Sequence, residues 1–224
     1  MNDILFETRG AAGIITLNRP QALNALTHAM VVAMKAQLDA WANDPAVAAV
    51  VVRGAGERGF CAGADIRAIA ESGRAGTSYG HDFWRDEYIL NAAIKHYPKP
   101  FVALISGIAM GGGLGLSVHG DYRIADETSL LAMPETGIGF FPDVGGSYFL
   151  SRCPGEIGMY LALTGARLKA ADALYAGIAT HLVRADARAE IVDALARGEN
   201  RAGLFSASEI PPPPDPSLAE RRIA

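Results

Sequence analysis

Two carboxylates lie in one short stretch that is otherwise largely apolar residues and glycine. Glu135 and Asp143 belong to the segment 133–146, MPETGIGFFPDVGG. Upstream, the glycine-containing segments 60–65 (FCAGAD) and 110–113 (MGGG) each precede an expected helix, where backbone N–H groups lack helical acceptors. Such N–H groups can stabilise an oxyanion while a nearby carboxylate attacks or moves a proton. This combination suits chemistry at an acyl carbonyl.

Each carboxylate also has a structural interpretation. Burial of Glu135 among Met133, Ile138 and Phe140 would raise its pKa and make it a usable acid or base. Its alternative is a loop carboxylate in a structural ion pair. Asp143 could orient a water molecule or cap the helix expected near residue 144, and the two roles are compatible.

The glycine-rich segments have physical reasons to approach a ligand. Asp65 is a natural N-cap, which leaves the N–H groups around it without helical partners. Three consecutive glycines, 111–113, allow the backbone to come close to a bound group. The alternative is a pair of tight strand-to-helix turns. Cys61 raises the question of a reactive thiol, although a free cysteine is usually a small buried hydrophobe.

Composition narrows the function classes. The chain has 224 residues, half of them hydrophobic, and a net charge of −4, which argues against general binding of nucleic acid. Two cysteines without a spacing pattern fit a reducing compartment. The five histidines show no metal-ligand spacing, so no metal site is expected. No apolar stretch is long enough for a membrane helix and no secretory signal begins the chain, so a cytoplasmic protein is expected.

The elements that must position these residues follow from local patterns. We expect a hairpin of strands 4–8 and 13–17, long helices over 27–42 and 79–95, and buried strands over 47–52 and 101–105. Short helices are expected near 145–152, 155–164 and 170–176, and a last strand over 179–183. Two rounds of helix, buried strand, glycine loop and helix predict an α/β chain of parallel crossovers.

The chain resembles the crotonase (enoyl-CoA hydratase/isomerase) superfamily and, within it, the 3-hydroxyisobutyryl-CoA hydrolase branch. The likeness covers about residues 4–184, and the order and spacing of the motifs make it specific. The matching segments are 18–26, 60–65, 85–91, 110–119, 134–146 and 160–165. The resemblance implies a spiral of repeated ββα units with C-terminal helices. It also implies an acyl-CoA substrate, no separate cofactor, and a homo-oligomer, either a trimer or a hexamer.

The resemblance also assigns roles to residues of this chain. It places the oxyanion-hole donors at Ala64 and Gly112, and the catalytic carboxylates at Glu135 and Asp143. Asp143, in the hydrolase-type segment 142–146 (PDVGG), would also help to bind the substrate hydroxyl. The expected substrate-binding residues are Glu87, Ala62, Gly63, Asp65 and Gly111. Arg19 and Arg58 could meet the phosphates of CoA.

Gly115 separates the possible reactions. Hydratases of the family carry a glutamate three residues after the middle glycine of the second loop, and Gly115 occupies that position here. The expected reaction is therefore hydrolysis of a 3-hydroxyacyl-CoA thioester, with an enoyl-CoA hydratase or isomerase as the alternative. A non-catalytic acyl-CoA-binding protein is the alternative from another class. For Glu87, which lies in a charged run, the competing interpretation is a solvated helix face.

The chain changes character after residue 184. We expect a crotonase-like catalytic domain over 1–184, and over 185–224 a helix followed by a Pro-rich segment that includes Pro211–Pro214. Members of the hydrolase branch continue with further helices. The C-terminal helical part is therefore expected to be incomplete, as in a shortened chain.

Overall fold

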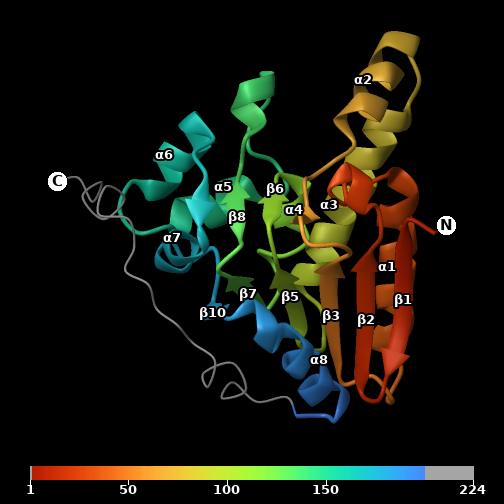
Figure 1. The fold of residues 1–224 in the computed structure, drawn as a ribbon. Helices are drawn as coiled ribbons and strands as arrows, with labels where there is room; N and C mark the ends of the chain where they lie inside the picture. The colour runs from red at the N-terminus through yellow and green to blue at the C-terminus, as the bar shows by residue number, and fades with distance from the viewer. Residues whose placement is uncertain (1, 200–224) are drawn as a thin grey trace.

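The computed structural model describes residues 2–199, and the predicted Pro-rich segment lies outside them. The larger of two sheets has the strand order β1-β2-β3-β5-β7-β10 and is parallel except for the β1–β2 hairpin (Figure 1). Its strands are β1 (Ile4–Arg9), β2 (Ala12–Leu17), β3 (Ala49–Gly54), β5 (Phe101–Ile105), β7 (Tyr122–Asp126) and β10 (His181–Val183).

The smaller sheet has the order β4-β6-β8-β9, with β9 antiparallel to β8. Its strands are β4 (Gly59–Cys61), β6 (Ile108–Met110), β8 (Leu130–Ala132) and β9 (Leu168–Lys169). The α-helices are α1 (His28–Ala42), α2 (Ile66–Ala75), α3 (Tyr79–Lys95), α4 (Gly112–Gly115), α5 (Gly146–Phe149), α6 (Ile157–Thr164), α7 (Ala170–Tyr175) and α8 (Arg188–Ala196). The 3₁₀ turns are η1 (Pro20–Ala22), η2 (Glu135–Ile138), η3 (Leu150–Arg152) and η4 (Ala185–Ala187).

The chain repeats one unit three times. In β3-β4-α2, β5-β6-α4 and β7-β8-η2, the first strand joins the larger sheet, the second joins the smaller sheet, and a helical turn follows. This confirms the repeated ββα units that the family resemblance implied. Because the strands of the smaller sheet run parallel from β4 to β8, the segments that follow them emerge at one edge.

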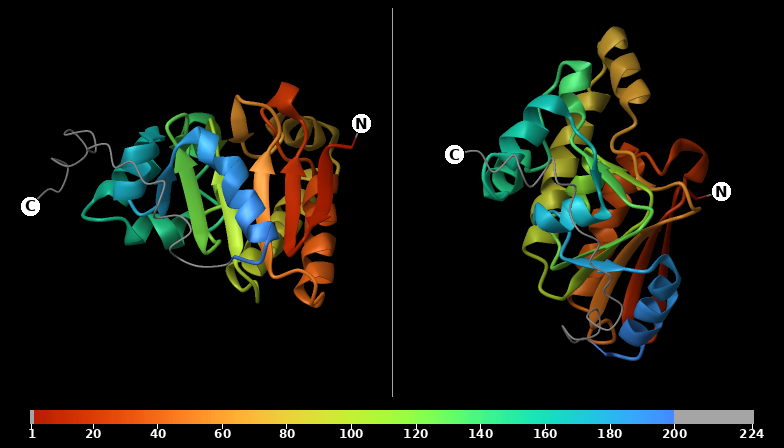
Figure 2. Two further views of the ribbon diagram at one scale, coloured as in Figure 1. Left: turned by 60° about the horizontal axis from the view of Figure 1, so that its bottom comes forward. Right: turned by 60° about the vertical axis from the view of Figure 1, so that its left-hand side comes forward.

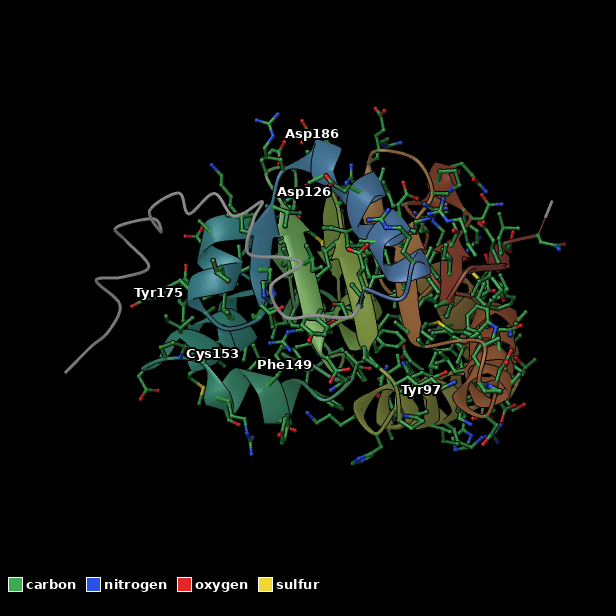
Figure 3. The ribbon with its side chains drawn as sticks, turned by 90° about the horizontal axis from the view of Figure 1, so that it is seen from below. Tyr97, Asp126, Phe149, Cys153, Tyr175 and Asp186 are labelled. Atoms are coloured by element: carbon green, nitrogen blue, oxygen red, sulfur yellow. The ribbon has the colours of Figure 1, made fainter. Side chains whose placement is uncertain are left out.

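Helices cover both faces of the larger sheet, as a parallel sheet requires. On one face Ile15, Val50 and Val52 belong to the core that includes residues of α1 and α3. On the other face Ile14 and Val51 pack in a second cluster with residues of α8. Figure 3, seen from below, shows α8 on one side of the sheet and α1 and α3 on the other.

Local sequence signals explain most element boundaries. Thr27 caps α1 as predicted, accepting a hydrogen bond from the N–H of Met30, and α3 spans the predicted residues. The strand expected from Val47 begins two residues later, because Val47 still belongs to a turn in which its N–H donates to Asp44 O. The short helices α5, α6 and α7 gather at the end of the molecule away from the N-terminal hairpin (Figure 2).

Within the described residues, no helix combines the length and apolar character needed to cross a bilayer.

Candidate active site

The first glycine-rich loop connects β4 to α2 and contains Ala64, one of the two predicted oxyanion-hole donors. Asp65 is the N-cap of α2 and accepts a hydrogen bond from the N–H of Ala68 at 3.4 Å. Gly63 has φ +97°, a conformation that favours glycine. The N–H of Ala64 donates to no acceptor within residues 2–199. The loop therefore presents an unused backbone donor.

The second loop brings another donor beside the first. Gly111, with φ +51°, ends the extended segment after β6, and Gly112 begins the short helix α4. The N–H of Gly112 also has no acceptor in the described part of the chain. A Cβ placed on Gly112 would lie 3.5 Å from the nitrogen of Ala64. The two predicted oxyanion-hole donors are therefore neighbours.

Two buried glutamates explain why these positions are glycine. A Cβ on Gly112 would meet Oε1 of Glu87, and a Cβ on Gly111 would lie 2.7 Å from Oε1 of Glu135. Any side chain larger than hydrogen would displace a carboxyl group from the loops. The second loop is therefore shaped to receive two carboxyl groups.

Glu87 and Glu135 have the features of functional rather than structural carboxyls. Their exposed fractions are 1% and 7%, and Glu87 Oε1 and Glu135 Oε2 are buried without a hydrogen-bond partner within residues 2–199. Burial, with smaller contributions from Asp143 and Glu135, raises the pKa of Glu87 to about 8. Burial, with a smaller contribution from Asp143, raises the pKa of Glu135 to about 7.

The structure removes two alternatives for these glutamates. The solvated helix face considered for Glu87 is wrong, because α3 turns this side chain into the protein. The structural ion pair considered for Glu135 has no counterpart among the described residues, where no cation lies within ion-pair distance of its carboxyl group. An unpaired buried carboxyl costs stability, which is a common feature of functional sites.

Asp143 does not cap a helix. The helix α5 begins at Gly146, its N-cap is Gly145 in a left-handed conformation, and no side chain bonds to its first turn. The Asp143 carboxylate instead accepts a hydrogen bond from the hydroxyl of Tyr88, with an oxygen–oxygen distance of 2.9 Å. Burial raises the pKa of Asp143, and the bond from Tyr88 opposes that effect.

One cavity, called here the site cavity, unites these groups. Its volume is about 500 Å³, and apolar side chains from α2, α3 and the segment after η2 form much of its wall. Trp84 and Phe140 stack there, with ring centroids 5.6 Å apart. Of the predicted site residues, those that line it are Ala62, Gly63, Ala64, Glu87, Gly111, Gly112, Glu135 and Asp143.

Asp65 is the one predicted site residue outside that lining. Its carboxylate pairs with the guanidinium of Arg19 at 3.1 Å. Arg19 is also paired with Asp3, whereas Arg58 is exposed on the β3–β4 loop. The substrate contact expected of Asp65 stays a prediction, as do the contacts of both arginines with phosphates.

Gly115 and Cys61 have clear structural roles. A Cβ on Gly115 would lie 2.8 Å from Cβ of Val144 and 3.0 Å from Nδ2 of Asn91, so no room exists for the glutamate of a hydratase. Cys61 is buried, and burial raises the pKa of its thiol to about 12. It packs as a small hydrophobe and does not supply a reactive thiolate.

Sequence reasoning missed Trp84, which lines the site cavity, and Tyr88, whose hydroxyl donates a hydrogen bond to Asp143. Both lie on α3 with Glu87. From Glu87, helical periodicity could have found Trp84, because residues three and four apart share a face, but it does not lead to Tyr88, the next residue in the chain. Once Glu87 is placed in the site, Trp84 at i−3 and Asn91 at i+4 follow on the same side.

Buried carboxyl groups lie opposite unused backbone donors, and these donors are on loops that follow parallel strands. The arrangement defines a class of α/β protein that binds a ligand at this edge of the smaller sheet. Residues 12–220 match the family model described as enoyl-CoA hydratase/isomerase, and the chain belongs to this family.

Two curated relatives share one name. The chain is 58% identical over 185 residues to the mitochondrial 3-hydroxyisobutyryl-CoA hydrolase of Danio rerio, an alignment that covers 83% of this chain and 48% of that protein. The Homo sapiens protein of the same name is 54% identical over 181 residues, covering 81% and 47%. The chain therefore spans about half the length of the curated relatives it matches.

Solved structures agree on the fold. A carnitinyl-CoA dehydratase from Mycobacterium thermoresistibile superposes with a TM-score of 0.94 at 48% identity, covering 99% of this chain and 65% of that one. An enoyl-CoA hydratase from Rhodobacter sphaeroides gives a TM-score of 0.92 at 44% identity, with the same coverage of both chains.

Proposed function

We propose that this chain hydrolyses a 3-hydroxyacyl-CoA thioester of the 3-hydroxyisobutyryl-CoA type to free CoA and the 3-hydroxy acid. The observation that carries the proposal is the pair of buried, unpartnered carboxylate oxygens of Glu87 and Glu135 beside the unused N–H groups of Ala64 and Gly112. The name shared by curated relatives at 54–58% identity supports this substrate class.

In the proposed reaction, the N–H groups of Ala64 and Gly112 bind the thioester oxygen as negative charge develops on it. Each such donor lowers the barrier by about 3–4 kcal/mol in well-studied enzymes. Glu135 can attack the carbonyl carbon, expel the CoA thiolate and form a mixed anhydride that water then cleaves. It can instead take a proton from water, which attacks as the C–S bond breaks, and return that proton to sulfur.

The remaining carboxyls orient the substrate and water. Asp143 and Glu87 face the same cavity and are assigned to the 3-hydroxyl group and the attacking water. The stacked rings of Trp84 and Phe140 supply an apolar wall for the acyl and pantetheine groups. None of these steps calls on a metal or a separate cofactor, and the expectation that none is needed stays a prediction.

The test is release of CoA thiol from 3-hydroxyisobutyryl-CoA by residues 1–224, compared with Glu135→Gln. We expect turnover in the unaltered chain and a loss of about 10²–10⁴-fold in the variant, with binding of the CoA ester retained. Asp143→Asn should also lose hydrolysis.

Other outcomes favour the alternatives. Conversion of crotonyl-CoA without thiol release would favour an isomerase or a hydratase, the latter being the activity named for the Rhodobacter sphaeroides structure. Binding of CoA esters without turnover, unchanged by Asp143→Asn, would favour a non-catalytic acyl-CoA-binding protein.

A homo-oligomer, a trimer or a hexamer, is part of the same proposal. Large apolar side chains such as Phe141 and Leu163 are 62% and 68% exposed in the single chain, and association would cover them. Sedimentation equilibrium should give the mass of three or six chains, and a monomer would contradict this. The expected cytoplasmic location has no support from the relatives, which are mitochondrial by name.

A further inference from the structure

Tyr88 contacts the site from a side that the proposed reaction does not use. Its hydroxyl donates to Oδ2 of Asp143 at 2.9 Å, joining α3 to the segment between η2 and α5. Within residues 2–199 it is the one side chain that donates a hydrogen bond to Glu87, Glu135 or Asp143. Asp143 therefore differs from Glu87 and Glu135 in receiving a hydrogen bond from a side chain.

A second cavity of about 650 Å³ lies against Asp143. Tyr88, Asn91 and Tyr148 line it, and Tyr88 does not line the site cavity, whereas Asp143 lines both. Tyr88 therefore reaches the Asp143 carboxylate from the second cavity, and a ligand in the site cavity meets the carboxylate rather than the tyrosine. Within residues 2–199, the hydrogen bond to Asp143 is the contact that links the Tyr88 hydroxyl to the site cavity.

The hydrogen bond from Tyr88 affects which of the three carboxyl groups is ionised. Glu87, Glu135 and Asp143 share a desolvated space, in which the charge of Asp143 raises the pKa of both glutamates and the charge of Glu135 raises the pKa of Glu87. A hydroxyl that donates to one carboxylate stabilises its charged form.

The second cavity is lined by further titratable groups in addition to Tyr148. They are Lys95, His96 and His119. Lys95 lies over the ring of Tyr148, with its ammonium 5.6 Å from the ring centroid, and His119 contacts Val144 O through Nε2 at 2.8 Å.

We propose that Tyr88 is a positioning residue that fixes the Asp143 carboxylate at the wall of the site cavity and favours its ionised form over those of Glu87 and Glu135. This inference rests on the proposed thioester hydrolysis. It predicts that loss of a single hydroxyl group, outside the substrate cavity, changes the pH dependence of the reaction.

The variant that tests it is Tyr88→Phe, which removes only the hydroxyl. Thiol release should fall by about tenfold or more near neutral pH, the size expected for a hydrogen bond to a charged group. The fall should lie in kcat rather than KM, and the acid limb of the rate profile should move to higher pH.

Tyr148→Phe is the matched control, because it removes a hydroxyl from the same second cavity that, within residues 2–199, makes no hydrogen bond to Asp143. Its rate and pH profile should equal those of the unaltered chain. Equal loss in both variants, or a Tyr88→Phe profile that does not move, would overturn the proposal.

A measurement without turnover separates this inference from the proposed function. The ¹³C resonance of the Asp143 carboxyl, identified by its absence in Asp143→Asn, should titrate at higher pH in Tyr88→Phe than in the unaltered chain. An unmoved midpoint would overturn the role of Tyr88 whatever the activity. A moved midpoint in a chain without hydrolysis would uphold the contact and reject the thioesterase.

Discussion

At the residue scale, Glu87 supplies a carboxyl group to the site and lowers the stability of the folded chain. Its carboxyl is buried in α3, has an unpartnered oxygen, and has a pKa raised from 4.5 to about 8. The unfolded chain loses this proton near the ordinary value, so between the two values the folded chain holds more protons. Stability must therefore fall as pH rises through this window.

We predict that Glu87→Gln removes this dependence. A single group contributes about 1.4 kcal/mol of lost stability per pH unit in the window, so the variant should be more stable than the unaltered chain at pH 8. Below about pH 4.5 the two should converge. Urea unfolding at a series of pH values measures the free energy directly.

The exposed Glu71 on α2 supplies the control, since Glu71→Gln should keep the slope of the unaltered chain. A Glu87→Gln protein that stays less stable at pH 8 would mean that the glutamate gains more from its surroundings than it loses by burial.

Residue types and spacing predicted much of the site, but not its contacts. The two loops and both carboxylates of segment 133–146 were found because each motif is local. The bond between Tyr88 and Asp143 joins residues 55 positions apart, and only the packing of α3 against the later segment creates it. The burial of Glu87 also depends on this packing. Its charged sequence neighbours left a solvated helix face open as an alternative.

At the scale of elements, α4 depends on the absence of a side chain at Gly115. The backbone there approaches Val144 and Asn91 so closely that a methyl group would lie 2.8 Å from Val144 Cβ. Gly115→Ala should therefore cost about 1–3 kcal/mol of unfolding free energy through overpacking.

Gly137→Ala is the matched substitution, because a Cβ there meets nothing within 4 Å. Its free energy of unfolding, measured in urea, should change by no more than about 0.5 kcal/mol, so its midpoint should hardly move. Equal midpoints for the two variants would show that α4 and the segment around Val144 can separate at no cost.

Elements were predictable from sequence where length and pattern agreed. The hairpin, α1, α3 and β5 each combine several apolar positions with a cap or a proline, and all were confirmed. The strands of the smaller sheet have two or three residues each, too few for a periodic signal. Their pairing depends on the spiral of the chain, which the family resemblance implied and local propensity could not.

At the scale of the whole molecule, α8 completes the core of the larger sheet. Ile191, Val192 and Leu195 are buried against the face formed by residues such as Ile14 and Val51. Each buried aliphatic side chain contributes about 1.5–3 kcal/mol, so the three together approach the net stability of an ordinary domain, about 5–15 kcal/mol. This packing bears on the predicted domain boundary after residue 184, which stays a prediction.

We predict that a chain ending at Arg184 does not fold cooperatively, whereas a chain ending at Glu199 does. The shorter chain leaves one face of a parallel sheet exposed, and such a surface favours aggregation. Thermal unfolding followed by circular dichroism, with light scattering for association, distinguishes the two. Leu195→Ala in the chain ending at Glu199 should lose about 2–5 kcal/mol by the same mechanism. A chain ending at Arg184 that melts cooperatively at the temperature of the longer one would show that residues 1–184 fold as a unit and that α8 only rests on them.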